Sequence, residues 1–299
     1  MIRLSWVVFV HAALLSIESI AVEIMTVHLQ LDPLVITANS IPLAGAVLLL
    51  IVFGSEKKKG VDVFRSWKYL LPGSMLLAAG VYAWYDSVGR VGASKEGLLS
   101  GPLETIAILF LARAFLAEKL TRLQLVGVTI ALAGFFATVL SSGLDTLITF
   151  GDLEAMLSAA AFGSGIIFIT KLTKTHPAEA VTASSLLISG LILAAVLWTS
   201  QQAPAISAQD WAALLLFSLL PLTAALTYIV GLSRIGASLT SVIGAFSILL
   251  TVAFQLALLW LNVDVILPAN IALAVAGGIM GVFGIYLIHV RTEKTFSVY

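Results

Sequence analysis

The sequence contains no cysteine, and only 11% of its 299 residues are charged. Without cysteine the chain has no disulfide bonds, thiolate metal sites or thiol catalysis. Soluble domains carry roughly 25% charged residues, whereas 60% of this sequence is hydrophobic, which excludes a water-soluble fold. Lysine and arginine total 16, as do aspartate and glutamate, so no excess of positive charge indicates a nucleic-acid partner.

Motifs typical of enzymes and cofactor sites are also missing from the sequence. It has no phosphate-binding loop, dinucleotide fingerprint, HExxH zinc motif or nucleophile elbow. We therefore expect a protein that is not an enzyme, that needs no cofactor or metal, and that does not hydrolyse ATP.

Long apolar runs fill most of the chain. A helix needs roughly 20 apolar residues to cross a bilayer, and these runs follow one another with short polar connections. The ten predicted spans are residues 5–27, 34–53, 69–87, 95–116, 123–141, 152–171, 179–199, 210–231, 238–261 and 269–289. They predict an all-α, multi-pass integral membrane protein. The first run continues across Glu18 and Glu23 without a small-residue cleavage site, so we expect a span there and not a signal peptide.

Basic residues alternate between the two sides of this predicted bundle. Fourteen lysine and arginine residues fall on one side, and only Arg90 and Lys95 fall on the other. Because basic residues collect in cytoplasmic loops, both termini are predicted to be cytoplasmic, in a plasma (inner) membrane of prokaryotic type. The run Lys57, Lys58 and Lys59 is expected to fix this orientation and to contact anionic lipid.

An internal repeat emerges when the sequence is shifted against itself by 144 residues. The shift aligns residues 90–94 with 234–238, which share Arg, Gly, Ala and Ser at matching places. We therefore predict two five-helix repeats, residues 1–144 and 145–299, within one membrane domain. Since five is an odd number of crossings, the second copy must lie inverted in the membrane. Inverted repeats of this kind are typical of alternating-access transporters, with the substrate site between the copies.

Residues in and after the fourth predicted span carry a family resemblance. They are Pro102, the segment 117–121 that reads Ala-Glu-Lys-Leu-Thr, and then Gln124, Gly127 and Gly134. Together with the two five-helix halves, they make the chain similar to the drug/metabolite transporter (DMT) superfamily, specifically its EamA-like ten-helix exporters. The resemblance covers essentially the whole chain and implies a transporter with that fold.

Ionisable residues inside the predicted spans are the main candidates for a binding site, because burying charge in a membrane is costly. Glu18 and Glu104 lie near the midplane and form the expected central pair. Glu96, Ser100 and Glu104 recur at intervals of four and so share one helix face, as His11 and Glu18 do at an interval of seven. We expect these residues to line a cavity that binds a cationic or zwitterionic solute or exchanges a proton with it. The alternative is a purely structural set of hydrogen bonds.

Charged residues near the predicted outer mouth form a second group. They are Glu23, Asp86 and Lys95, and they either help substrate entry or hold the bundle together, for instance through an ion pair of Lys95 with Glu23 or Glu96. Gly101 and Pro102 in the fourth span are a predicted hinge, because proline removes a backbone hydrogen bond and broken helices often mark transporter sites. A simple packing kink is the alternative.

Aromatic residues of the third and eighth spans could contact an organic substrate. The repeat aligns Trp84 with Tyr228, and Tyr82 lies two residues before Trp84. Tryptophan and tyrosine are also enriched at membrane interfaces, and we expect that anchoring role for Tyr85.

Small residues of the fifth and tenth spans are expected to allow close helix packing. They are Gly127, Ala131 and Gly134, and then Gly277, Gly281 and Gly284. The pair Gly277 and Gly281 could equally join two protomers, which leaves a homodimer open.

The combined observations predict a secondary active transporter that exports a small organic solute, such as an amino acid, amine, drug or related metabolite, by alternating access. The expected partners are that solute and the lipid bilayer. A lipid flippase, a phosphorylated-metabolite exchanger and a membrane scaffold are the alternatives. A phosphate exchanger would need cationic groups in the cavity, and Lys95 is the only candidate.

Overall fold

The computed structural model describes residues 2–55, 62–116, 121–141, 148–200 and 206–289, and within these ranges it contains helices and no strand. The helices are α1 (Ile2–Val27), α2 (Pro33–Ser55), α4 (Trp67–Val91), α5 (Ala93–Leu116), α6 (Arg122–Leu140), α7 (Phe150–Thr173), α8 (Ala178–Thr199), α9 (Ala208–Phe217), α10 (Leu219–Gly244), α11 (Phe246–Trp260) and α12 (Ile271–His289). The all-α fold class is thereby confirmed. The predicted lysine run 57–59 lies outside the described residues.

Seven segments among the described residues are long and apolar enough to cross a membrane, and α11 is a shorter apolar helix. Helices α4 and α5 are not among the seven segments. They carry Asp86, Arg90, Lys95, Glu96 and Glu104, which lower their apolar character. Helices α4 and α5 are therefore the most polar of the bundle, and they carry most of the candidate site residues.

The second half departs from the predicted spans in one region. The eighth span is divided at Ser218 into α9 and α10, and α10 continues to Gly244 where a turn at 234–238 was expected. In the first half the corresponding turn depends on Gly92, whose φ of 86° ends α4. Among the described residues no such left-handed conformation occurs near Gly236, so the helix continues and the turn falls at Ala245 instead.

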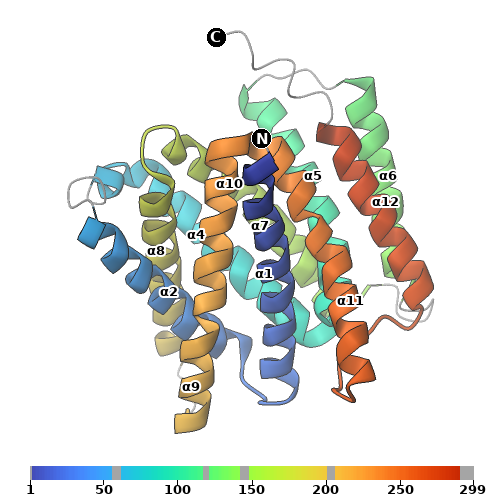
Figure 1. The fold of residues 1–299 in the computed structure, drawn as a ribbon, viewed down its shortest axis with the longest axis horizontal. Helices are drawn as coiled ribbons and strands as arrows, with labels where there is room; N and C mark the ends of the chain where they lie inside the picture. Colours follow the sequence, from blue (N-terminus) through green and yellow to red (C-terminus); the bar gives the residue numbers. More distant parts are fainter. Residues whose placement is uncertain (1, 56–61, 117–120, 142–147, 201–205, 290–299) are drawn as a thin grey trace.

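Helices from the two halves pack against each other in pairs. The most extensive contacts join α6 to α12, α4 to α7, α2 to α8, and α1 to α10. Each pair contains one helix from each repeat. The 144-residue shift relates α1 to α7 and α4 to the α9–α10 region, so the α4–α7 contact and the α1–α10 contact are equivalent. Figure 1 shows α6 and α12 at one edge of the bundle and α2 and α8 at the other, with the remaining helices between them.

Glycine residues hold α6 and α12 together at close range. A Cβ atom at Gly127 would meet the carbonyl oxygen of Gly284, and one at Gly134 would meet that of Gly277. The matching residues run in opposite directions along the two helices, which are therefore antiparallel. The predicted close packing is confirmed. The glycine stripe is thus occupied within the chain, so it is not available for a dimer; the homodimer itself stays an untested prediction.

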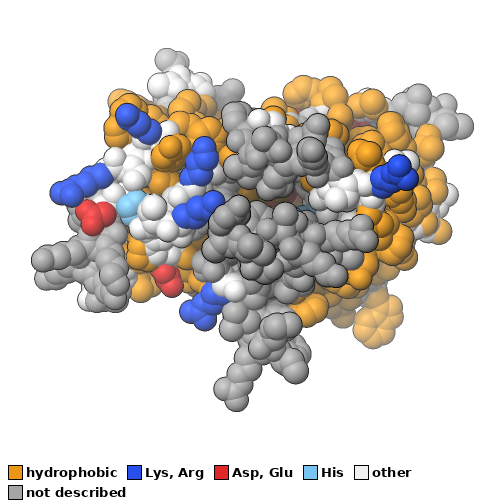
Figure 2. Space-filling view, turned by 90° about the horizontal axis from the view of Figure 1, so that it is seen from above, with side chains coloured by type: hydrophobic (Ala, Val, Ile, Leu, Met, Phe, Trp, Pro, Cys, Tyr) orange, Lys and Arg blue, Asp and Glu red, His pale blue; other side chains and the backbone are white. Residues whose placement is uncertain are grey.

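The bundle has two distinct ends. The start of α1 and the end of α12 lie together at one end (Figure 1), which we call the terminal end. Figure 2 looks onto it and shows Lys and Arg side chains gathering there. Lys171, at the end of α7, lies over the ring of Tyr69 at the start of α4, with 5.3 Å between its Nζ and the ring centroid. Arg90 and Lys95 mark the opposite end, called the far end below.

Candidate functional site

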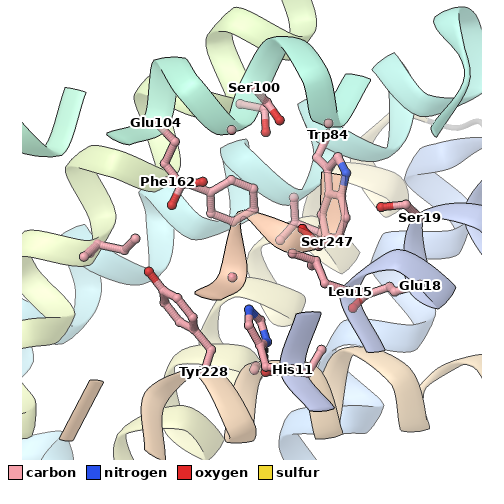
Figure 3. A pocket seen from close by; sticks show the side chains of 18 of the residues that line it. His11, Leu15, Glu18, Ser19, Trp84, Ser100, Glu104, Phe162, Tyr228 and Ser247 are labelled. Atoms are coloured by element: carbon pink, nitrogen blue, oxygen red, sulfur yellow. Dashed lines mark hydrogen bonds between the residues drawn. The ribbon is translucent and has the colours of Figure 1, made fainter. Parts of the chain in front are cut away.

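A cavity of about 260 Å³ lies in the middle of the bundle, between helices of both halves. Side chains from α1, α2, α4 and α5 of the first half line one part of it, and side chains from α7, α8, α10, α11 and α12 of the second half line the rest (Figure 3). Its lining includes seven of the eight residues predicted for the central site: His11, Glu18, Trp84, Glu96, Ser100, Glu104 and Tyr228. Gly101 also lines it, whereas Tyr82 does not and is 37% exposed elsewhere.

One face of α5 supplies the polar stripe of the cavity. Glu96, Ser100 and Glu104 all line it, as their four-residue spacing predicted. Glu96 is only 2% exposed, and its carboxyl group lies close to the side chains of Ser100 and Trp84. Its Oε1 atom has no hydrogen-bond partner among the described residues. A buried acceptor without a partner is costly. A ligand that donates a hydrogen bond to this oxygen would remove that cost.

Glu18 approaches the cavity from α1 and has a partner of its own. The hydroxyl group of Tyr85 donates a hydrogen bond of 2.6 Å to its Oε1, and both side chains are buried. The Tyr85 ring packs against Trp84 and Phe217, at centroid distances of 5.1 and 5.8 Å. The prediction that Tyr85 anchors the membrane interface was wrong, because its helix turns this face toward α1 and not toward lipid.

Glu18 and Glu104, the expected central pair, both line the cavity. Figure 3 shows them on different sides of the cavity, with Phe162 and Trp84 between them in this view. Glu96 and Glu104 lie on one face of α5, two helical turns and so about 12 Å apart along its axis, whereas Glu18 belongs to a separate contact with Tyr85.

Aromatic rings form part of the cavity wall. Trp84 and Phe162 meet edge to face, with centroids 6.1 Å apart, and Tyr228 lies beside His11 at 5.0 Å. The His11 Nδ1 atom lies 2.9 Å from the carbonyl oxygen of Ala224, which ties α1 to α10. Phe162 was missed at the sequence level, because a phenylalanine in an apolar span carries no signal that separates a cavity wall from a lipid contact.

At the far end, Glu23 joins three segments of the chain. Its carboxylate accepts hydrogen bonds from the backbone nitrogens of Ala93 and Ile266 and from the side-chain nitrogen of Gln255. The Gln255 oxygen in turn accepts from the Ser94 nitrogen at 3.2 Å. Glu23 and Ser94 belong to the first half, and Gln255 and Ile266 to the second. This cluster, which we call the far-end network, therefore connects the two halves.

A buried ion pair adds a second connection at the far end. The Lys95 Nζ atom lies 2.6 Å from Oδ1 of Asp152, and these side chains are at most 5% exposed. The other Asp152 oxygen accepts from the Thr149 nitrogen in a capping box that begins α7. The alternative of a Lys95 pair with Glu23 or Glu96 was wrong. Asp152 was overlooked because an acidic residue in the first turn of a helix is normally explained by capping.

Arg90 and its acidic neighbours lie beside this pair. The guanidinium group contacts Asp86 and Glu154, each at 3.0 Å. The contact with Asp86 stays within α4, whereas the contact with Glu154 reaches α7 of the other half. Asp86 is thus part of the far-end contacts, as its predicted place near a mouth of the bundle suggested.

Comparison with known proteins identifies the family. The sequence model of the EamA-like transporter family matches residues 4–140 and again residues 149–289. The chain belongs to the EamA-like transporter family. It is therefore a multi-pass membrane transporter of the drug/metabolite transporter type, and the family contains transporters and not enzymes. No curated protein sequence matches it.

Solved structures share the EamA-like fold of this chain. One crystal structure, described only as that of a protein, matches with a TM-score of 0.69 and 19% sequence identity. The match covers 97% of this chain and 99% of the other. At this identity the similarity shows the common fold alone.

The predicted hinge of this EamA-like transporter lies in an unbroken helix. Helix α5 continues through Pro102 from Ala93 to Leu116. A Cβ atom at Gly281 of α12 would come within 2.9 Å of the Pro102 ring, so the proline packs against a helix of the other half. Gly101 faces the cavity. A hinge at this point stays a prediction.

Proposed function

We propose that this protein is a secondary active transporter that exports a small organic solute by alternating access, with the central cavity as its binding site. The observation that carries the proposal is the position of the cavity. Both halves of the repeat line it, and its largely apolar lining contains three carboxyl groups. A site between inverted repeats near the midplane is the arrangement that alternating access uses.

The shape of the cavity supports an assignment of its open and closed sides. Its lining reaches Ile169 and Ile285, each about one turn from the terminal end of its helix. Toward the far end the lining stops at Glu96 and Ser19, below the far-end network. We infer a conformation that is closed at the far end. Opening that end would require the two halves to separate at Glu23 and at the pair of Lys95 and Asp152.

The acidic pair on α5 is the proposed site of proton exchange. Glu96 and Glu104 line the same cavity from one face of α5, and two negative charges in one site from which water is excluded are costly. A bound cation and a bound proton would each relieve that cost, so the two would compete. Such competition is how a proton gradient can drive a cationic solute in the opposite direction.

The phosphorylated-metabolite exchanger is disfavoured by the lining. No lysine or arginine occurs among the described residues that line the cavity, and a phosphate group needs such partners. Lys95, the one candidate at the sequence level, is occupied by Asp152.

Solute-induced proton flux in proteoliposomes would test the proposal. A pH-sensitive dye inside the vesicles should report flux when amines, amino acids or related solutes are added, and Glu104→Gln should abolish it. Glu179→Gln is the matched control, because Glu179 is an exposed carboxylate on α8 that does not line the cavity. Equal flux with the wild type and Glu104→Gln would contradict the proposed role of the cavity.

A further inference from the structure

We propose that the cavity is selective for an organic monocation with an aromatic or similarly apolar body, and that it rejects the amino acid formed by adding a carboxylate to the same molecule. The inference rests on the proposed function, since it takes the cavity to be the substrate site. It goes further by choosing between the cationic and zwitterionic solutes that the sequence left open.

The charges of the lining favour a cation without a carboxylate. Glu18, Glu96 and Glu104 are present, and the described lining residues include neither lysine nor arginine. His11 has one ring nitrogen against the Ala224 carbonyl oxygen. A substrate carboxylate would therefore enter an apolar site among three carboxyl groups without a cationic partner, and such a buried, unpaired charge is strongly disfavoured.

A specific atom is available to receive the cation. The Oε1 atom of Glu96 is buried and has no hydrogen-bond partner among the described residues, although Glu96 lines the cavity. An ammonium group has three N–H donors, and hydrogen bonds that involve charged groups are the stronger ones. A protonated amine at this position would satisfy the free oxygen, on the helix face that also carries Glu104.

The aromatic wall suits the rest of such a molecule. Trp84 lies beside Glu96 and meets Phe162 edge to face, while Tyr228 closes another side (Figure 3). Aromatic faces attract cations, tryptophan most strongly, and they also bury apolar groups. The cation-binding oxygen and the apolar wall thus adjoin, as the two parts of an arylalkylamine do.

The hydroxyl groups of the lining do not change this preference. Ser19, Ser158 and Ser247 can each donate one hydrogen bond to a substrate oxygen. They would supply donors for a carboxylate but no positive charge. The repulsion from Glu96 and Glu104 would remain, and an amine avoids it.

Two ligands that differ only by a carboxylate provide the test. Phenethylamine and phenylalanine share the same ring and amino group, and their binding to the purified wild-type protein in detergent would be measured by isothermal titration calorimetry at neutral pH. We expect phenethylamine to bind at least tenfold more tightly. Equal or tighter binding of phenylalanine, or no binding of phenethylamine, would overturn the proposal.

Variants locate the binding site. Glu96→Gln should weaken phenethylamine binding at least tenfold, since an amide keeps the shape but loses the charge, whereas Glu179→Gln should leave it unchanged. If Glu96→Gln does not fold, Trp84→Leu provides the second variant and should also weaken binding. Unchanged affinity in the folded variants would contradict the proposed position of the cation.

The outcome for substrate class is distinguishable from the outcome for function. If phenylalanine binds tightly and drives a proton flux that Glu104→Gln abolishes, the monocation proposal is wrong and the transport proposal stands. If phenethylamine binds with the expected dependence on Glu96 but no proton flux accompanies any solute, the selectivity stands and the proposed coupling fails.

Discussion

The hydroxyl group of Tyr85 donates a 2.6 Å hydrogen bond to Glu18, and this contact joins α4 to α1 inside the membrane-spanning bundle. It gives a buried carboxyl group the partner that an apolar interior requires. The same contact turns Tyr85 away from lipid and places its ring against Trp84, which lines the cavity. A structural hydrogen bond thus positions part of the proposed site.

Removing this donor should destabilise the protein. In Tyr85→Phe the Glu18 carboxyl group loses its partner, which costs about 1–3 kcal/mol in the free energy of unfolding. Thermal unfolding of the purified protein in detergent would measure the change. Tyr82→Phe is the control, because Tyr82 lies three residues earlier on α4, is partly exposed and does not line the cavity. Equal unfolding temperatures for the two variants would show that the contact contributes nothing.

The pair of Lys95 and Asp152 should be worth more than an exposed ion pair. Lys95→Met leaves a buried aspartate without its cation, and breaking a buried pair typically costs about 3–5 kcal/mol. Changing both residues, Lys95→Met with Asp152→Asn, should recover much of this loss because the unpaired charge is gone. Chemical unfolding of the single and double variants would measure both effects.

An exposed ion pair on the same protein provides the comparison. Arg65 and Asp62 lie 3.5 Å apart with both side chains largely exposed, and such pairs contribute about 0–1 kcal/mol. Arg65→Gln should therefore leave the free energy of unfolding nearly unchanged. If Lys95→Met is as mild as Arg65→Gln, the far-end pair does not hold the two halves together.

Glycine at the contact of α6 and α12 should not tolerate even a methyl group. At Gly134 a Cβ atom would collide with backbone atoms of Gly277 and Gly281, which belong to a helix and cannot yield easily. Gly134→Ala should therefore lower the unfolding temperature, whereas Gly54→Ala meets open space and should be neutral or slightly stabilising, since alanine favours helix. A neutral Gly134→Ala would contradict the close packing of these helices.

Much of the fold was predictable because apolar periodicity, repeat spacing and small-residue stripes are properties of single segments. Each predicted span from 5–27 to 179–199 overlaps one helix of the structure. The continuation of α10 past Gly236 was not predictable, because whether a glycine adopts a left-handed conformation depends on its surroundings. Gly92 adopts it where the α4–α5 turn contacts Ile266.

The site was predictable to the extent that charge in an apolar span is rare. Glu18, Glu96 and Glu104 stand out for that reason, and all three line the cavity. The hydrogen bond between Glu18 and Tyr85 was not predictable, since it depends on how α1 packs against α4. Asp152 belongs to the capping box that begins α7, which explains an aspartate at this position. Its ion pair with Lys95 therefore left no separate signal in the sequence.

Membrane orientation stays a prediction that reporters can check. A reporter fused at the C-terminus and one inserted near Lys58 should both give a cytoplasmic signal, because basic residues gather on the terminal end (Figure 2). A reporter inserted within residues 200–209 should give an external signal. A cytoplasmic signal from that position would contradict the predicted number of crossings before it.

The relation among the three carboxyl groups can be tested by combining variants in the proton-flux assay. Glu96 and Glu104 lie on one face of α5 and line the same cavity, so we expect them to act as one unit. Glu96→Gln and Glu104→Gln should then each lose coupling, and the double variant should be no worse than either, as is expected for residues that act as a unit. Glu18 has its own partner in Tyr85, so Glu18→Gln alone should keep a measurable solute-induced proton flux. A flux abolished by Glu18→Gln as completely as by Glu104→Gln, with a flux retained in Glu96→Gln, would favour the central pair predicted from the sequence.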